Sequence, residues 1–234
     1  MESDADKMKK TAPRPRWKQD PEAVRSDILK VATAEFSENG LSGARIDEIA
    51  AKTKTSKRMI YYYFGDKAGL YRQVLEEAYR GVRAGEQQLE LDHLPPVEGL
   101  RKLTEFTFDH HSRNPDFVRM IMIENIHRGR YLEQSTVIRD VNRTAILKLE
   151  SIYRRGLDQG VFREGVTPLQ LHWQISAFSF FNVSNRHTFA LNFGETLFTP
   201  DGQAALRDRV ADMVVNFAVV PSLRTTLGAA AAGE

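Results

Sequence analysis

The most distinctive polar chemistry of this 234-residue chain lies in residues 52–67, where five basic residues stand against a single acid, Asp66. Two of these basic residues, Lys57 and Arg58, are adjacent and are followed by Met59. An arginine such as Arg58 can bond the O6 and N7 atoms of guanine together, and a methionine can pack against the methyl group of thymine. A basic patch of this kind suits the phosphates of a nucleic acid, although a short charge run is as often a solvated surface.

A second arrangement that suggests chemistry is Glu124-x-x-His127, a spacing found in helical di-iron sites. Such a site needs another Glu-x-x-His pair and two further carboxylates facing it from other helices. The other pair in the sequence, Glu90-x-x-His93, directly precedes Leu94-Pro95-Pro96, where no helix is expected to continue. We therefore expect neither a metal nor another cofactor. His110 and His111 are expected to be solvated on different faces of one helix. Gly-rich phosphate loops, Gly-x-Ser-x-Gly and His-Glu-x-x-His are absent as well, which argues against an enzyme.

Two short segments must position the basic residues. The apolar residues of segment 46–50 and of segment 57–64 each fall at helical spacing, and the polar run 52–56 between them is long enough only for a tight turn. Ser56 is suited to cap the second helix through its hydroxyl. Arg45 precedes the first helix and is a further candidate for a phosphate contact. Two short helices joined by such a turn are typical of a helix-turn-helix that reads DNA.

This pattern resembles the helix-turn-helix of the TetR family of transcriptional regulators. The matching residues lie at fixed spacing near the N-terminus: Ile49, Ala50, Ser56, Ile60, Tyr61, Tyr62, Tyr63, Phe64, Lys67 and Leu70. One departure is Lys54, because the family usually has glycine at this turn position, so the turn is expected to have a strained or differently built backbone. The resemblance implies that the following residues hold phosphates: Thr55, Ser56, Tyr61, Tyr62 and Lys67.

The resemblance also implies a mode of action. A homodimer would repress a promoter by occupying a palindromic operator in double-stranded DNA, and a small-molecule effector of unknown identity would release it. Two alternatives stay open. One is a DNA-binding architectural protein that has no effector, and the other, which the missing motifs disfavour, is a helical-bundle enzyme.

Helix start and stop signals predict an all-α protein of about nine helices. A three-helix DNA-binding domain would precede a larger helical domain for ligand binding and dimerisation. Asp20-Pro21-Glu22 begins the first helix, Asn39-Gly40 ends it, and Leu94-Pro95-Pro96 marks a domain boundary. The expected parts are a disordered basic arm (1–19), the DNA-binding domain (20–67), a connecting helix (68–94), the effector-binding and dimerisation domain (95–222) and a disordered tail (223–234). The arm could equally contact DNA or only keep the chain in solution.

The second domain offers aromatic residues for both a pocket and a dimer interface. A helix is expected from Leu169 to about Phe189 and a final one over residues 203–219, and we expect homodimerisation through these two helices. The segment 115–126 is apolar nearly all round, which predicts a buried helix at the centre of the domain. The candidate pocket residues come from the helices expected to surround this centre: Phe106, Met122, Ile126, Phe178 and Asn182.

Bulk composition limits the remaining classes. The chain is 41% hydrophobic and 27% charged, and it lacks an apolar run of the roughly 20 residues that a membrane helix requires. It also contains no cysteine, which excludes disulfides, thiolate metal sites and thiol nucleophiles. These features predict a cytoplasmic protein without a membrane partner.

Overall fold

A computed structural model describes residues 20–223, which form ten α-helices and two short 3-10 helices. The predicted all-α fold is confirmed. The helices are α1 (Pro21–Gly43), α2 (Ile46–Lys52), α3 (Lys57–Phe64), α4 (Lys67–Gln87), η1 (Leu91–His93), α5 (Pro96–Arg113), α6 (Pro115–Ile126), α7 (Thr136–Asp158), α8 (Pro168–Ser184), α9 (Arg186–Phe193), η2 (Thr196–Phe198) and α10 (Pro200–Ala218). The predicted arm at 1–19 lies outside the described residues, as does all of the predicted tail except Leu223.

Several helices begin at side-chain caps that are visible in the sequence. The Asp20 carboxylate accepts a hydrogen bond from the N–H of Glu22 at 3.1 Å, and the Asp66 carboxylate accepts one from the N–H of Gly69 at 2.6 Å. Gly40 interrupts the regular turns of α1 with a φ of 64°, a conformation that glycine adopts without steric cost. Local signals therefore fix where the helices of the N-terminal unit start and stop.

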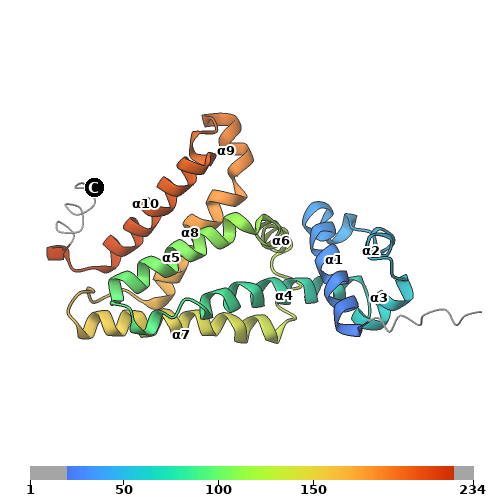
Figure 1. Ribbon diagram of the computed structural model, residues 1–234, viewed down its shortest axis with the longest axis horizontal. Helices are drawn as coiled ribbons and strands as arrows, with labels where there is room; N and C mark the ends of the chain where they lie inside the picture. The colour runs from blue at the N-terminus through green and yellow to red at the C-terminus, as the bar shows by residue number, and fades with distance from the viewer. Residues whose placement is uncertain (1–19, 224–234) are drawn as a thin grey trace, which may run out of the picture.

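The N-terminal helices share one apolar core with the first half of α4. Ile28, Phe36, Ile49 and Ile60 are each 0% exposed in it. Figure 1 shows α1, α2 and α3 gathered at one end of the molecule, with α4 running from them into the second group of helices. Because α4 also packs against α7 of the second group, a displacement of this helix acts on both groups.

The second group of helices is organised around α5, which packs against α10, α8 and α7. Its core contains the buried residues Leu100, Leu149, Leu171 and Val214. Within residues 20–223, no helix combines the length and the apolar character that crossing a bilayer requires. The second group is thus a helical bundle in which α5 packs most extensively against α8 and α10.

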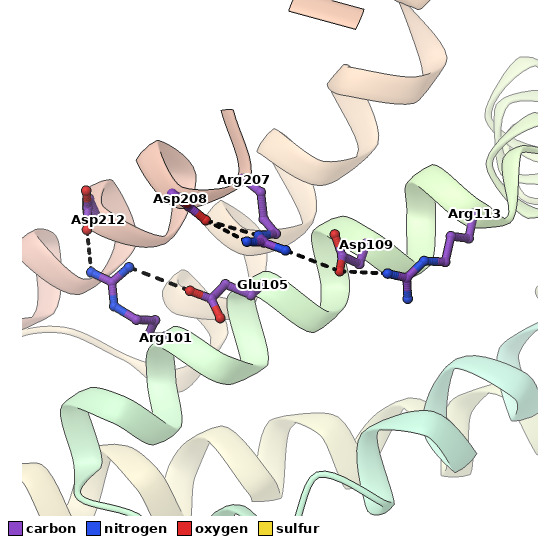
Figure 2. A network of polar contacts seen from close by, with 7 residues as sticks. All are labelled: Arg101, Glu105, Asp109, Arg113, Arg207, Asp208 and Asp212. Carbon is purple, nitrogen blue, oxygen red and sulfur yellow. Dashed lines mark hydrogen bonds and ion pairs between the residues drawn. The ribbon is translucent and has the colours of Figure 1, made fainter. Parts of the chain in front are cut away.

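Surface ion pairs join α5 to α10 along their length (Figure 2). Arg101 of α5 pairs with Asp212 of α10 and lies 3.6 Å from Glu105, while Arg207 of α10 lies 3.7 Å from Asp109 of α5. Exposed pairs of this type each contribute at most about 1 kcal/mol. The apolar contacts therefore hold α5 and α10 together, and the ion pairs help to align them.

Two predictions about helices are wrong. The single helix expected from Leu169 to about Phe189 is divided at Asn185, which has a φ of −104° and a ψ of 3° and whose side chain donates to the Ser184 hydroxyl at 2.9 Å. The backbone N–H of Asn185 still bonds the carbonyl of Phe181 at 3.1 Å, so the break lies in the backbone angles of this one residue. The helix α6 is not buried on all sides either, because Ile126 in its last turn is 75% exposed.

Candidate functional site

The helix α3 exposes a polar face because its apolar residues hold it against the N-terminal core. Ile60 is 0% and Phe64 5% exposed, and both anchor the helix. The Ser56 hydroxyl accepts a hydrogen bond from the N–H of Met59 at 3.2 Å, so the predicted cap is present. The exposed residues of α3 are Lys57, Arg58, Met59, Tyr61 and Tyr62.

The other predicted DNA-contacting residues come from the elements next to α3. Arg45 directly precedes α2 and is exposed, Thr55 lies half-buried in the turn, and Lys67 is half-buried in the first turn of α4. The helix α3 packs against both α2 and α4 at one end of the molecule (Figure 1). The structure therefore gathers the nine predicted residues around one short helix.

Several of the basic side chains already have protein partners. The ammonium of Lys57 pairs with the carboxylate of Asp47, and that of Lys67 donates to the backbone carbonyl of Ser42 at 3.4 Å. By contrast, the guanidinium groups of Arg45 and Arg58 make no hydrogen bond or ion pair with any other residue of the described segment, 20–223. These two guanidinium groups can therefore bond a further group without breaking a contact within the described segment.

Glu35 ties this basic face to α1, a role that the sequence did not reveal. Its side chain is 6% exposed and accepts from the backbone N–H of Arg45 at 3.2 Å and from the Lys52 ammonium at 3.1 Å. Burial alone would raise the pKa of this carboxyl, but the bonds from Lys52 and Arg45 outweigh it and lower the pKa below its usual value. Glu35 therefore holds the start and the end of α2 in place beside α3.

The turn between α2 and α3 has the strained backbone that the sequence predicts, because a lysine stands where the family usually has glycine. Lys54 has a φ of 52°, in the left-handed region that favours glycine. The next N–H, that of Thr55, bonds back to the carbonyl of Ala50 at 3.1 Å and closes the turn. The chain therefore keeps the turn geometry with an ordinary residue, at some cost in stability.

A cavity of about 490 Å³ lies in the second group of helices, between α4, α5, α6, α7 and α8. Its walls are largely aromatic and aliphatic, formed by Tyr79, Val82, Phe117, Ile121, Ile146, Leu169, Trp173, Ala177 and Phe180. Its polar lining residues are Arg83, Glu86, Thr107, His111, Asn125, Asn142, His172 and Ser176. An apolar cavity with a few fixed polar groups is the usual form of a small-molecule site.

The charges of this cavity are internally paired. One guanidinium nitrogen of Arg83, Nη1, donates to both carboxylate oxygens of Glu86 at 2.5 and 2.6 Å. Burial raises the pKa of Glu86, while Arg83 and the nearby Lys148, which bonds the backbone carbonyl of Glu86, act in the opposite direction. Burial also raises the pKa of Tyr79 to about 12. The only ionic pair of the described lining residues is therefore Arg83 with Glu86.

Two histidines line the cavity without carrying a charge at neutral pH. Burial lowers the pKa of His111 to about 4 and that of His172 to about 4. The Nδ1 atom of His111 lies 2.8 Å from the carbonyl of Thr107, and this side chain is only 7% exposed. The prediction that His110 and His111 are both solvated is therefore wrong for His111.

None of the five residues predicted for a pocket lines this cavity. Ile126 is on the surface, and Phe106 packs against Gly85, where a Cβ atom would come within 2.6 Å of its ring. Phe178 and Asn182 line a separate groove of about 420 Å³ between α8, α9 and α10, and Met122 lines another beside α6. Asn182 bonds Gln203 of α10 at 2.9 Å, so it joins α8 to α10.

The sequence carries a signal for the cavity that was missed. Tyr79, Val82, Arg83 and Glu86 are spaced by three or four residues along α4, so they share one face of it. A charged pair within an otherwise apolar stripe marks a buried polar site. The tempting Glu124 instead accepts backbone N–H groups of Tyr131 and Leu132 at 3.1 and 3.0 Å, and so holds the loop after α6.

The segment that contains α2 and α3 and the segment that forms most of the second group of helices each match a described family. Residues 28–74 match "Bacterial regulatory proteins, tetR family", and residues 96–214 match "Tetracyclin repressor-like, C-terminal domain". The chain belongs to the TetR family. The resemblance seen in the helix-turn-helix is thus confirmed, and so is the prediction of a DNA-binding transcriptional regulator.

Curated TetR-type relatives match long parts of this chain. It is 36% identical over 172 residues to the HTH-type transcriptional repressor NicS of Pseudomonas putida, which covers 74% of this chain and 81% of that protein. It is 34% identical over 112 residues to the HTH-type transcriptional repressor SCO4008 of Streptomyces coelicolor, covering 47% and 54% of the two chains. Both matches join the chain to regulators of this family.

Solved structures of TetR-family size share the fold. The ketosteroid transcriptional regulator KstR2 of Mycobacterium tuberculosis superposes with a TM-score of 0.62 at 18% identity, over 84% of this chain and 95% of that one. PfmR of Thermus thermophilus, a TetR family transcriptional regulator, gives a TM-score of 0.55 at 24% identity, over 80% and 96%. At these identities the likeness concerns the arrangement of the helices.

Proposed function

We propose that this TetR-family regulator represses transcription as a homodimer that holds a palindromic operator until a small molecule enters the cavity. The observation that carries the proposal is the helix α3, which two buried residues fix to the core while Arg58 stays exposed and unpaired within residues 20–223. The names of NicS and SCO4008, both HTH-type transcriptional repressors, support repression as the sign of the response.

In this proposal the residues around α3 divide their work between bases and phosphates. Arg58 bonds a guanine edge, and Lys57 and Met59 contact neighbouring bases, because the N-terminal residues of a recognition helix reach base edges. The flanking residues hold the backbone and so set the register: Arg45, Thr55, Ser56, Tyr61, Tyr62 and Lys67. Lys57 has to exchange its pairing with Asp47 for DNA, which an exposed pair does at little cost.

Dimerisation is proposed through α8 and α10, the last two long helices. Their outer faces expose large apolar side chains: Phe178 is 40%, Phe181 54% and Met213 45% exposed. Apolar side chains that gather in one area mark an association surface, whereas scattered ones do not. A two-fold dimer built on this surface presents two copies of α3, which requires an operator with two inverted half-sites.

The cavity is proposed as the effector site, and α6 as the helix that connects it to the reader. Phe117 and Ile121 of α6 line the cavity. On the side of α1, the Ser37 hydroxyl donates to Asp116 of α6 at 2.9 Å, and Arg119 of α6 pairs with Glu38 at 2.8 Å. A ligand that displaces α6 therefore displaces α1. Release follows if the ligand binds the displaced arrangement more tightly than the DNA-bound one.

This proposal assigns the reader to residues 20–67, the connection to 68–94 and effector binding with dimerisation to 95–222. The test uses a duplex that the wild-type protein enriches from a random library, together with a scrambled duplex, in fluorescence anisotropy titrations at several salt concentrations. Arg58→Ala should lose about 1–3 kcal/mol of preference for the enriched duplex, because a base contact is removed.

A second variant separates base reading from phosphate contact. Lys67→Ala should weaken binding to both duplexes alike and reduce the salt dependence, since a phosphate contact releases counterions from any sequence. Arg139→Ala, an exposed arginine of α7, is the matched control and should change neither quantity. If Arg58→Ala keeps its full preference for the enriched duplex, the assignment of the reading face is wrong. An operator that no small molecule releases would instead favour the architectural alternative.

A further inference from the structure

The cavity contains two buried polar atoms that have no partner. Within residues 20–223, neither the Nε atom of Arg83 nor the Oδ1 atom of Asn142 has a hydrogen-bond partner, and both side chains line the cavity. The first atom is a donor and the second an acceptor. Buried polar groups normally have hydrogen-bond partners. An unpartnered donor and an unpartnered acceptor in one cavity therefore indicate which hydrogen-bonding groups a ligand supplies there.

The partnership of Arg83 with Glu86 restricts how a ligand can use the guanidinium. Glu86 takes both of its bonds from Nη1, which leaves Nε without a partner within residues 20–223. Because Nε is covered in the free protein, a ligand reaches it only by moving the side chains around it. A ligand atom bonded to Nε must accept a hydrogen bond. A ligand atom bonded to Asn142 Oδ1 must donate one.

The charge of the cavity argues against an ionised ligand. Arg83 is already neutralised by Glu86, and His111 and His172 are uncharged at neutral pH because burial lowers each pKa to about 4. An entering carboxylate would lie beside the Glu86 carboxylate and would lose its hydration without gaining a free cation. An entering ammonium would meet the guanidinium of Arg83. Ions removed from water in this way are unfavourable unless they gain a full partner.

The walls of the cavity favour a flat ring. Tyr79, Phe117, Trp173 and Phe180 supply aromatic surface from α4, α6 and α8, and aromatic faces and edges pack well against another ring. The volume of about 490 Å³ accommodates a molecule larger than one ring, within the range usual for organic ligands.

We propose that the effector of this cavity is an uncharged aromatic molecule that carries both a hydrogen-bond acceptor and a hydrogen-bond donor, as an aromatic amide does. Its acceptor bonds Nε of Arg83, its donor bonds Oδ1 of Asn142, and its ring packs among the aromatic walls. The assignment rests on the proposed function above, because it concerns the ligand of the same cavity.

Three probes of nearly equal shape test the assignment on the full-length protein. Benzamide is uncharged and has both a donor and an acceptor, acetophenone has only the acceptor, and benzoate is charged. The chain has two tryptophans, Trp17 and Trp173, so selective ¹⁵N labelling of tryptophan gives two indole signals, and Trp17→Phe assigns that of Trp173. Titrating each probe while following the Trp173 signal reports both affinity and location, since Trp173 lines the cavity.

Benzamide should bind about tenfold more tightly than acetophenone, because one added hydrogen bond is worth about that factor. Benzamide should also bind at least tenfold more tightly than benzoate. In Asn142→Leu, which keeps a similar shape, the preference for benzamide over acetophenone should disappear. Removal of Arg83 alone would leave the Glu86 carboxylate buried without a partner. The second variant is therefore the uncharged double substitution Arg83→Met with Glu86→Gln. All three probes should bind this variant more weakly than they bind the wild-type protein.

The proposal is overturned if benzoate binds as tightly as benzamide, if Asn142→Leu leaves the ratio unchanged, or if none of the three probes shifts Trp173. These results leave the DNA-binding role intact so long as Arg58→Ala still loses its sequence preference. If Arg58→Ala keeps that preference, the reading face is wrong whatever the probes do. The two failures are therefore distinguishable.

Discussion

The outer face of α3 and the cavity of the second domain are both polar, yet they are built in opposite ways. Around α3 the apolar residues face inward, with Ile60 at 0% exposure, and the basic groups stay in water or in exposed pairs such as Lys57 with Asp47. In the cavity, Arg83 and Glu86 are themselves buried, with side chains 11% and 7% exposed. One region is an exposed basic surface that suits a charged polymer, and in the other the buried positive and negative charges are paired with each other.

This difference predicts where the molecule tolerates change. An exposed cation can be removed without leaving a buried charge behind, so substitutions at α3 should affect DNA binding and leave folding nearly unchanged. A buried ion pair behaves otherwise, because the loss of one partner leaves the other charge uncompensated in the interior. The two regions should therefore separate binding defects from stability defects.

The largest effect is expected for Glu86→Ala. Removing this carboxylate strands the Arg83 guanidinium, and breaking a buried pair in this way typically costs about 3–5 kcal/mol. Urea denaturation followed by circular dichroism measures the loss in the free energy of unfolding. The double substitution Arg83→Met with Glu86→Gln removes both charges and is the control, which should recover most of that loss. Equal stability of Glu86→Ala and wild type would show that the pair is not buried in solution.

A second contrast between the regions is their response to acid. The folded-state pKa of His111 and of His172 is about 4, against an ordinary value of 6.5, so the unfolded chain binds protons at a higher pH than the folded chain does. Their contribution to stability is therefore complete above about pH 6.5 and is lost as the pH falls from there towards 4. Glu35 of the reader, with its pKa lowered below 4.5, matters only in stronger acid.

Urea denaturation at pH 7, 6 and 5 tests this order. The wild-type free energy of unfolding should fall over this range, and His172→Gln should reduce the fall because it removes one of the groups that must take up a proton. A fall of the same size in His172→Gln and in wild type would contradict the part assigned to His172.

The smallest effect is expected at the turn of the reader. A non-glycine residue in the left-handed region costs about 1–2 kcal/mol, whereas glycine loses more chain entropy on folding, so Lys54→Gly should gain roughly 0.5–1 kcal/mol. Lys54→Ala keeps the Cβ atom and is the matched control, which should gain nothing. Thermal unfolding compares the two variants, and a gain shared by both would place the effect in the lysine side chain instead of the backbone.

Much of the reading domain was predictable because its signals are local. Ser56 and Gly40 each act through a cap or a backbone conformation within a few residues, and both behave in the structure as the sequence indicates. Even the strain at Lys54 followed from one residue and its neighbours. A helix-turn-helix is formed by about thirty consecutive residues, so its pattern can be recognised from the sequence alone.

The cavity was not predictable in the same way, because five helices contribute to it and no local pattern says which faces meet. Phe178 and Asn182, which were expected in a pocket, line the groove between α8, α9 and α10 and not this cavity. Hydrophobic periodicity also passed over the short interruption at Asn185, where one residue leaves the helical conformation. Tertiary packing decides both outcomes, and spacing within one helix shows only which residues share a face, as it does for Tyr79, Arg83 and Glu86 of α4.

The central claim is that two copies of the reader act together on one operator. Because the chain contains no cysteine, a single cysteine at Glu48→Cys, on the exposed side of α2, can carry one spin label per subunit. Double electron–electron resonance then measures the distance between the two labels. The account predicts a dipolar coupling in the free protein whose distance distribution narrows when the enriched duplex is added. At the same duplex concentration, the narrowing should be smaller when Arg58→Ala is present as well. A label pair without coupling, or a distribution that the duplex leaves unchanged, would contradict a dimeric reader.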